Sequence, residues 1–509
     1  MSYALSPQRT EPIPKRSHTS LVLIVACVAQ LMVVLDVSVV MVALPQMRHD
    51  LHLTVAGQQW VVNAYTLTFA GFLLLGGRAA DLWGRKRIFL LGLALFTGFS
   101  LLGGLAQNGT WLILARAAQG LGGAVLAPAT LSLLITTFPA PDERRRALGA
   151  WSATAASGAA IGVLLGGILT QVVDWRWVLF INVPIGAVLI VVTALAVEES
   201  RSATPPGSLD LAGAITVTAG LATLVYGIVG TDTHSWGSPA TIDPLALGAA
   251  LLALFLVIEA RFARHPLVPL GVFRIRSLSV SNGIAMALGS ALFGFFFFLT
   301  LYMQQVNGYS ALKGGIAFLP AGLATLTGAL VGTRLVARLG ARRQLVLGPL
   351  LAAGGFIWLT VLTPGNGYIA HIFGPLVMTG FGFGLSFVPM TMSATGGLPP
   401  SQAGLAAGLI NTTRQVGGAI GLAVMGTVAA NAASQNDGTA SSIASALTNG
   451  YDRAFLIGAC ALLVAVGLAL LLPGKSRVTA HYEAPVAAQA EPEVADLRAS
   501  QGAWVPSEA

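Results

Sequence analysis

The sequence predicts an all-α membrane protein with fourteen transmembrane helices, built as two pseudo-symmetric six-helix bundles with two extra helices inserted between them. Three observations support this prediction: apolar segments of membrane-spanning length, an uneven distribution of lysine and arginine, and an internal repeat. A transmembrane helix needs about 20 mostly apolar residues. Fourteen such segments occupy approximately residues 20–45, 58–77, 88–106, 110–137, 147–172, 177–197, 210–230, 243–262, 278–305, 311–337, 343–363, 368–392, 402–430 and 453–473.

The composition excludes a soluble domain. Charged residues make up 9% of the chain, hydrophobic residues 55%, and the mean hydropathy is +0.77. The net charge of +8 does not indicate a nucleic-acid partner, because the basic residues flank apolar segments, where they meet anionic lipid. Cys27 and Cys460 both lie inside predicted spans, so neither a disulfide nor a metal site is expected. The polar residues 1–19 lead into a span too long for a signal peptide, so no cleaved leader is expected.

Lysine and arginine fall in alternate gaps between the spans. With a cytoplasmic N-terminus, 22 of the 28 basic residues lie in cytoplasmic tails and loops or at the cytoplasmic ends of spans, four lie in external loops and two lie deeper within spans. The four external residues are Arg48, Arg176, Lys313 and Arg453. The positive-inside rule therefore predicts that both termini are cytoplasmic. We expect a multi-pass protein of the bacterial cytoplasmic (inner) membrane.

Five regions follow from the spans. Residues 20–197 and 277–473 are the predicted six-helix bundles, and residues 198–276 hold the two extra helices, spans 7 and 8. Residues 1–19 are rich in proline, and residues 474–509 are rich in alanine, glutamate and proline. Both segments are predicted to be disordered cytoplasmic tails. The external loop near 431–452 is rich in serine, asparagine and alanine, which favours flexibility.

Two pairs of segments indicate an internal duplication. Gly158–Leu169 matches Gly417–Val428 at five of twelve positions, and the turn Gly84–Arg87 matches Gly340–Arg343. Together they place span 2 on span 10 and span 5 on span 13, which leaves spans 7 and 8 as the insertion. Transporters commonly contain such repeats, with the substrate site between the halves near the membrane midplane.

Asp36 is the only one of the 20 acidic residues that lies well inside a span. An acid at the centre of a transmembrane helix costs about 3 kcal/mol, so it indicates function. At 1.5 Å per residue, Asp36 in span 1 and Arg116 in span 4 lie roughly 13 Å and 9 Å from the external ends of their spans. These depths allow a contact, direct or through water.

Burial favours the protonated form of the Asp36 carboxyl, whereas a nearby arginine favours the carboxylate. A carboxylate that binds either a proton or a substrate is sufficient for exchange transport. The alternative is that Asp36 only neutralises a buried cation. For Arg414, the other intramembrane charge, the alternative is snorkelling or a link from span 13 to a neighbouring helix.

Five motifs occur in order along the first half of the chain. They are Leu35–Pro45 in span 1, Gly77–Arg87 between spans 2 and 3, Arg116–Gly120 in span 4, Gly158–Gly167 in span 5 and Trp175–Pro184 leading into span 6. In this order and spacing they resemble the major facilitator superfamily and, within it, the fourteen-span drug/proton antiporters. The sequence departs from that pattern at Met41, Leu82 and Val163, where asparagine, a basic residue and proline are usual.

The resemblance implies roles for three groups of residues. It implies proton coupling by Asp36 and Arg116, and close helix packing by the antiporter glycines Gly158, Gly162, Gly166 and Gly167. The cytoplasmic gate motif consists of Gly77, Asp81, Gly84, Arg85, Lys86 and Arg87. Gly84 allows a tight turn, and Asp81 is placed to meet arginines or a helix N-terminus. Asp81 is expected to latch the halves together; the alternative is a basic loop that only sets topology.

Candidates for the lining of a substrate site combine aromatic, methionine and amide side chains. Such surfaces accept varied apolar shapes, while a few polar groups orient the ligand. The candidates are Met32, Asn63, Tyr65, Gln119, Phe293, Tyr302, Gln305, Phe318, Asn411 and Arg414. For each of them the alternative is plain helix packing or lipid contact. In the family that the chain resembles, exporters of dications often carry a second acid in span 10. Residues 311–337 contain none, so the resemblance implies that monovalent cationic or neutral amphipathic compounds are the substrates.

The sequence thus predicts a proton-coupled exporter of hydrophobic or amphipathic small molecules, such as drugs, antibiotics or toxic metabolites, that functions as a monomer in the lipid bilayer. The proton gradient is the expected energy source, and no cofactor is expected. The chain contains no G-x-x-x-x-G-K-[ST] motif for a nucleotide and no nucleophile–base pair or metal cluster that predicts an enzyme. The alternatives are a dedicated exporter of one endogenous metabolite and, less favoured, an uncoupled facilitator.

Overall fold

The computed structural model describes residues 16–138, 140–200, 207–396, 398, 403–434 and 440–473. Within these ranges the chain forms helices and no strand. The α-helices are α1 (Arg16–Asp50), α2 (Val55–Trp83), α3 (Arg85–Gly104), α4 (Gly109–Thr137), α5 (Pro141–Val172), α6 (Trp177–Phe180), α7 (Asn182–Ala196), α8 (Leu211–Val229), α9 (Pro239–Val257), α10 (Arg276–Leu301), α11 (Ala311–Leu339), α12 (Ala341–Leu359), α13 (Gly374–Thr395), α14 (Ala403–Ala433) and α15 (Ala440–Ala469). Short 3₁₀ or π segments are η1 (Gly230–Asp232), η2 (Ile258–Phe262), η3 (Leu270–Arg274), η4 (Tyr302–Val306) and η5 (Tyr368–Phe373).

Most of these helices have the length and composition of membrane spans. Twelve of the described helices are long and apolar enough to cross a bilayer. The two remaining predicted spans are also helical, as α5 with 32 residues and α12 with 19. Large apolar side chains point outward on several helices, for example Leu195 at 83% and Leu114 at 65% exposure. Such surfaces suit contact with lipid, and the protein is a multi-pass membrane protein; the count of fourteen crossings stays a prediction.

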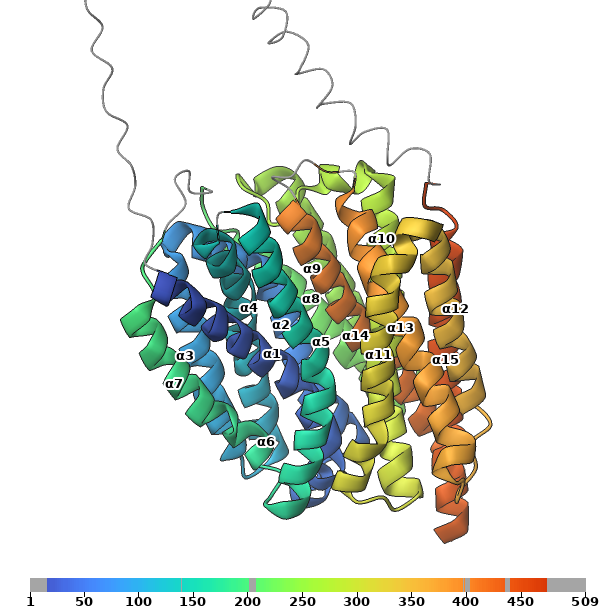
Figure 1. Cartoon of the computed structure of the whole chain (residues 1–509). Coiled ribbons are helices and arrows are strands. Elements are labelled where there is room, and N and C mark those ends of the chain that lie inside the picture. Colours follow the sequence, from blue (N-terminus) through green and yellow to red (C-terminus); the bar gives the residue numbers. More distant parts are fainter. Residues whose placement is uncertain are drawn as a thin grey trace, which may run out of the picture.

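The helices pack in a pattern that occurs twice. In the first half, α1 packs on α5, and α2 and α3 pack on α4; in the second half, α10 packs on α14, and α11 and α12 pack on α13. The two most extensive contacts between the halves are α5 with α11 and α2 with α14 (Figure 1). These are equivalent contacts, because the sequence repeat pairs α5 with α14 and α2 with α11. The boundaries of the predicted bundles stay a prediction.

Glycines at equivalent places make this packing close. A Cβ on Gly162 would lie 2.0 Å from Ser38 Oγ in α1, and a Cβ on Gly421 would lie 2.5 Å from Ser290 Cα in α10. The turns before α3 and α12 also match, because Gly84 has φ +104° and Gly340 has φ +81°, values that favour glycine.

The helices of the predicted insertion lie against the seam between the halves. Helix α8 packs on both α2 and α14, and α9 packs mainly on α8. The contact with α2 is close, because a Cβ on Gly71 would meet the side chain of Thr218. The hydroxyl of Thr427 in α14 donates to the carbonyl of Ile228 in α8 at 2.9 Å. Helix α8 therefore touches both halves at once.

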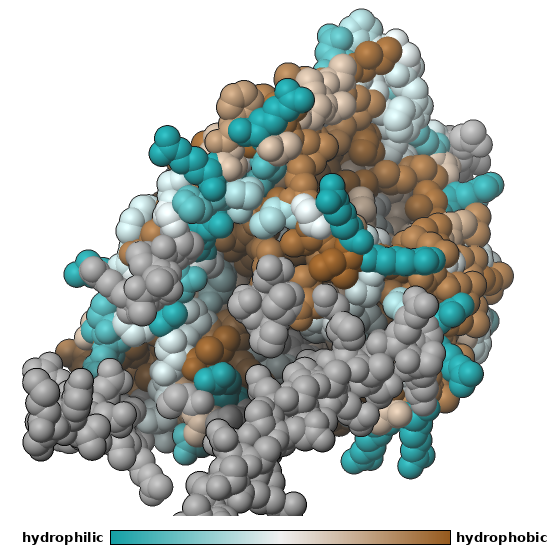
Figure 2. Space-filling model, turned by 90° about the horizontal axis from the view of Figure 1, so that it is seen from above, coloured by the Kyte–Doolittle hydropathy of each residue, from teal (hydrophilic) through white to brown (hydrophobic). Residues whose placement is uncertain are grey.

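Both ends of the described chain lie at one face of the molecule, the upper face in Figure 1. We call it the termini face. Figure 2 looks onto this face, where hydrophilic side chains stand around and between hydrophobic ones.

Two sequence-based boundaries were wrong. Helix α1 begins at Arg16, so the last residues of the predicted tail 1–19 are helical. The loop predicted near 431–452 is helical from Ala440, the first residue of α15. Its composition favours flexibility, but Tyr451 donates to Gln305 Oε1 at 3.0 Å and its ring packs against Phe298, so tertiary contacts stabilise a helix here. Residues 1–15 and 474–509, the rest of the predicted tails, lie outside the described residues.

Candidate functional site

The carboxylate of Asp36 is fully buried in α1 and accepts hydrogen bonds from three side chains. Arg116 Nη1 donates to Oδ2 at 2.5 Å, and Gln119 Nε2 donates to Oδ1 at 2.7 Å. Asn182 Nδ2 also donates to Oδ1, at 3.1 Å. Each of the three donors is at most 2% exposed. The expected contact between Asp36 and Arg116 is thus direct; its role in proton coupling stays a prediction.

The guanidinium of Arg116 is held on several sides. Besides Asp36, Nη1 donates to Gln119 Oε1 at 2.7 Å, and Nε donates to the carbonyl of Val61 at 3.3 Å. The guanidinium also lies over the ring of Tyr65, 4.3 Å from its centroid, a favourable cation–π arrangement. A buried ion pair persists only when its remaining groups are hydrogen-bonded, and here most of them are.

Glycines in α4 bring this arginine to its partners. A Cβ on Gly120 would lie 2.4 Å from the carbonyl oxygen of Tyr65, so α4 and α2 meet backbone to backbone. Arg116 and Gln119 are three residues apart and share one face of α4. The motif Arg116–Gly120 therefore supplies a cation, an amide and the close approach that directs both toward α1.

Sequence reasoning missed Asn182 and Ser100 as parts of this site. Asn182 Nδ2 also donates to Ser100 Oγ at 3.0 Å, and the Ser100 hydroxyl donates to the carbonyl of Leu179 at 2.8 Å. The site thereby reaches α3, α6 and α7. An amide inside an otherwise apolar span was the available signal, but we noted Asn182 only as part of a motif.

In the gate motif, Gly84 forms the expected turn, and the N-terminus of α3 receives a carboxylate that was not predicted. Glu199 accepts from the backbone N–H groups of Lys86 at 3.1 Å and Arg87 at 3.2 Å. A negative charge is favourable at this end of a helix. Asp81 pairs instead with Arg85, at 3.4 Å.

Among the described contacts, Asp81 makes none with the second half, so the latch between the halves stays a prediction. The Arg85 side chain donates to Ser200 Oγ at 3.2 Å, and Lys86 Nζ donates to the carbonyl of Ala194 at 2.8 Å. The contacts of Arg85 and Lys86 join α3 to the end of α7 and the segment after it, and that of Asp81 with Arg85 joins α2 to α3, all within the first half. Gly77 makes an ordinary contact, since a Cβ there would lie 3.5 Å from Pro128 Cβ.

The four antiporter glycines lie on two faces of α5. Gly158, Gly162 and Gly166 face α1, where added Cβ atoms would meet Val34, Ser38 and Val39. A Cβ on Gly167 would lie 2.7 Å from the carbonyl oxygen of Ala311 in α11. Helix α5 therefore packs closely on α1 and, at the same time, on α11 of the other half.

The candidate lining residues separate into groups. Tyr65 and Gln119 belong to the network around Asp36 described above. Phe318 packs edge-on against Phe295, with ring centroids 6.1 Å apart, and Phe293 packs on Gly418. Tyr302 and Gln305 are held near the end of α10 away from the termini face, since the Tyr302 hydroxyl donates to the carbonyl of Thr363 at 2.7 Å.

Three other candidates take part in different contacts. Arg414 Nη2 donates to Asn411 Oδ1 at 2.8 Å, and its guanidinium lies 5.6 Å from the ring centroid of Phe387 in α13. Arg414 thus contacts a neighbouring helix and does not reach Asp36 in this structure. Asn63 is buried, and neither its oxygen nor its nitrogen has a hydrogen-bond partner in the described structure. Met32 is also buried, in an apolar cluster of the first half.

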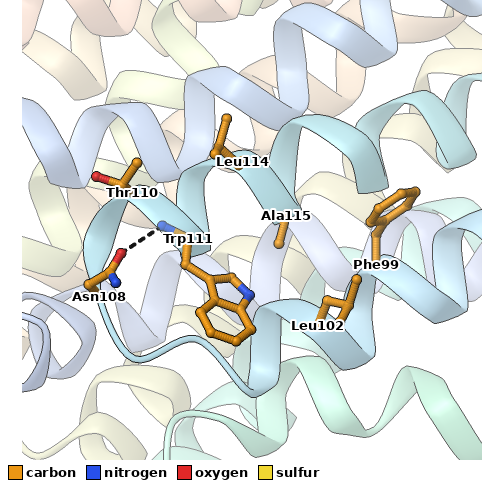
Figure 3. Close-up of a pocket in the computed structure, with 7 residues that line it drawn as sticks. All are labelled: Phe99, Leu102, Asn108, Thr110, Trp111, Leu114 and Ala115. Atoms are coloured by element: carbon orange, nitrogen blue, oxygen red, sulfur yellow. Dashed lines mark hydrogen bonds between the residues drawn. The ribbon is translucent and has the colours of Figure 1, made fainter.

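A separate pocket of about 650 Å³ lies between α3 and α4 (Figure 3). Its walls include Leu102, Trp111 and Leu114, which are 42%, 38% and 65% exposed. It opens on the outer surface of the bundle and contains none of the predicted site residues. Among the described residues, no three histidine, cysteine or acidic side chains lie together as metal ligands.

A buried ion pair inside a duplicated bundle of apolar helices defines a membrane transporter. The sequence profile of the Major Facilitator Superfamily matches residues 26–422. The chain belongs to this superfamily, as its motifs predicted.

Curated relatives resemble the chain over nearly its full length. The cephamycin export protein CmcT of Amycolatopsis lactamdurans is 43% identical over 485 residues, covering 94% of this chain and 98% of its own length. The puromycin resistance protein pur8 of Streptomyces alboniger is 39% identical, covering 88% and 89%. The multidrug resistance protein Stp of Mycobacterium tuberculosis (strain ATCC 25618 / H37Rv) is 34% identical, covering 81% and 76%.

Solved structures of transporters share the fold. A POT family peptide transporter has a TM-score of 0.65 at 17% identity and covers 89% of this chain and 96% of its own. A bacterial homologue of the lysosomal transporter Spinster has a TM-score of 0.62 at 17% identity, covering 90% and 97%. At this level of identity the likeness concerns the fold alone.

Proposed function

We propose that this protein is a proton-coupled antiporter that exports hydrophobic or amphipathic small molecules from the cytoplasm. The observation that supports this most is the Asp36 carboxylate, buried among apolar helices and paired with Arg116 at 2.5 Å. A carboxyl held in this way carries a proton when it is neutral and binds a cation when it is charged. Export of drugs and antibiotics by close relatives supports the direction of transport and the class of substrate.

Coupling requires that the proton and the substrate compete for Asp36. Protonation of the carboxyl removes the negative charge that faces Arg116 and weakens a bond that joins α1 to α4. A lipophilic cation that reaches Asp36 has the same effect, because it offers a competing positive charge. One proton that returns across 100 mV supplies about 2.3 kcal/mol, which can drive a neutral substrate outward. In a one-for-one exchange with a monovalent cation the two charge movements cancel, and the pH gradient alone drives export.

The proposed orientation places the termini face in the cytoplasm of a bacterial cell membrane. Among the described residues, the basic side chains near the ends of α2 and α11 and at the starts of α3 and α12 lie at that side, as the positive-inside rule requires. We infer a functional monomer, because each predicted component of the site lies within one chain. The absence of an acid in α11 favours monovalent cationic or neutral substrates over dications.

The test uses purified protein in proteoliposomes with an imposed proton gradient and ethidium as a lipophilic monovalent probe. We expect wild-type protein to accumulate ethidium against its gradient and to release protons when the probe is added. Asp36→Asn should abolish uphill transport, because the neutral amide cannot exchange a proton, while Asp36→Glu should retain part of it. Asp142→Asn, a change of the same kind outside the spans, serves as the matched control.

Undiminished uphill transport by the Asp36→Asn protein would contradict the proposal. Flux that only follows the probe gradient, in both wild type and variant, would identify an uncoupled facilitator instead. The second candidate function, export of a single endogenous metabolite, is favoured by the likeness to a cephamycin export protein. A panel of unrelated lipophilic compounds separates the two, since a dedicated exporter responds to few of them.

A further inference from the structure

The donors to Asp36 differ in how firmly they are held. Gln119 uses both ends of its amide, since Nε2 donates to Asp36 and Oε1 accepts from Arg116. Rotation of this amide would break two hydrogen bonds. The guanidinium of Arg116 has only donors, so it can donate to an oxygen of the carboxyl but cannot accept a hydrogen bond from its O–H group.

The amide of Asn182 has one end free. Its Nδ2 donates to Asp36 Oδ1 and to Ser100 Oγ, whereas its Oδ1 is buried and has no hydrogen-bond partner within the described structure. A carboxylate has no proton to donate, so the amide nitrogen has to face it. A protonated carboxyl has an O–H group and needs an acceptor, which the unpaired oxygen of Asn182 offers.

We propose that Asn182 is a positioning residue for the coupling carboxyl, which donates to Asp36 when it is ionised and accepts from Asp36 when it is protonated. The change requires only rotation of the amide about its Cβ–Cγ bond. No covalent bond is made or broken other than the O–H bond of the carboxyl. This inference rests on the proposed function, because it requires Asp36 to exchange a proton during transport.

The rotation has a consequence for the neighbouring helices. Ser100 Oγ now accepts from Asn182 and donates to the carbonyl of Leu179. When the Asn182 oxygen turns toward Asp36 it also turns toward Ser100, whose hydroxyl can then donate to it in place of the Leu179 carbonyl. The protonation state of a group in α1 is thereby passed to α3 and α6.

Few other ionisable groups lie close to Asp36. Arg116 of α4 and Tyr65 of α2 are the charged and titratable side chains around it. The remaining helices at the site carry no ionisable residue in their central turns, which are residues 88–104, 147–172, 177–196, 277–301 and 314–333. Asn182 therefore acts on Asp36 without a titration of its own.

The experiment follows the protonation of Asp36 directly. Infrared difference spectra of the full-length protein in lipid are recorded as a function of pH, and the carboxyl band that is lost in Asp36→Asn is assigned to Asp36. In Asn182→Leu, which removes both donor and acceptor at nearly constant size, we expect the midpoint of that band to rise by about one pH unit. The bond to the charged carboxylate is stronger than the bond from the neutral carboxyl, so its loss outweighs the loss of the acceptor. Asn182→Asp should raise it further, because two adjacent carboxyls cannot both be ionised.

The matched control is Asn282→Leu, which removes a buried amide of α10 that bonds to the Leu278 carbonyl and to Thr413. Its midpoint should equal that of the wild type. Unchanged midpoints in Asn182→Leu and Asn182→Asp would overturn the inference while leaving the proposed function intact. If Asn182→Leu does not fold, the isosteric Asn182→Asp decides alone. If no band disappears in Asp36→Asn, Asp36 does not titrate, and the proposed function fails with the inference.

Discussion

The centres of the two halves have the same packing and opposite chemistry. Gly162 faces Ser38 in α1 and Gly421 faces Ser290 in α10, so Asp36 corresponds to Leu288. Gly120 packs on Tyr65 and Gly380 packs on Ala321, so Arg116 corresponds to Leu376 and Gln119 to Thr379. Leu288 and Leu376 are 1% and 0% exposed. The first half thus buries an ion pair where the second half buries two leucines.

This difference shows that the charges are not needed to build a half. Glycine contacts between helix backbones recur in both, and they hold the second half together around an apolar centre. The ion pair of the first half is therefore better explained by its chemistry than by packing. Replacing buried ion pairs with apolar residues is often neutral or stabilising in other proteins, which agrees with this view.

The largest expected effect comes from placing an acid at the apolar centre. Leu288→Asp should destabilise the protein by about 3 kcal/mol, because the second half offers Leu376 in place of an arginine partner. The measurement is the midpoint of thermal unfolding in detergent, followed by tryptophan fluorescence. Leu288→Asn, of equal size and without charge, is the control. Equal midpoints for the two variants would show that the second half tolerates a buried charge as the first does.

A smaller effect should distinguish the glycine contacts of the two halves. Gly421→Ala places a Cβ 2.5 Å from the backbone Cα of Ser290, so a helix has to shift. We expect a loss of about 2 kcal/mol, as for other overpacked sites. Gly162→Ala meets the Ser38 hydroxyl, which can rotate away, and should lose about half as much. Gly98→Ala, with no atom within 4 Å, is the control in the same unfolding assay. A larger loss of stability in Gly162→Ala than in Gly421→Ala would show that the contact of α5 with α1 is the more rigid of the two.

The smallest effect concerns the turns that begin α3 and α12. Glu199 binds the N-terminus of α3, and among the described contacts α12 has no comparable carboxylate. Glu199→Gln should lower stability by about 0.5 kcal/mol, since the amide oxygen still accepts hydrogen bonds but the charge is lost. The loss should shrink in high salt. Glu198→Gln is the control, and an equal change in both variants would mean that only net charge matters.

Much of the fold was predictable because hydropathy and the positions of lysine and arginine act over whole segments. Twelve of the fourteen predicted spans meet the criteria of length and hydropathy, and the turn at Gly340 repeats the positive φ of Gly84. The helix from Ala440 to Tyr451 was missed because its composition resembles a loop, and the contact of Tyr451 with Gln305 arises only after folding.

The site was predicted in part for a similar reason. A charge in an apolar segment is conspicuous, so Asp36 and Arg116 were found from sequence alone. Asn182 was not assigned, because an amide near the end of an apolar helix gains meaning only when α7 packs beside α1 and α3. Glu199 was missed because the bond it forms depends on where the chain after α7 passes the start of α3. Sequence patterns describe one segment at a time, so they do not predict contacts between residues that are far apart in the chain.

The position of α8 constrains any relative motion of the halves. This helix packs on α2 of the first half and on α14 of the second. When the halves move relative to each other, α8 has to move with one of them and slide along the other. At the closest point of its contact with α2, the side chain of Thr218 occupies the space that a Cβ on Gly71 would take. A bulky residue at Gly71 would therefore slow the relative motion of the halves, and with it transport, without changing a residue that contacts the substrate.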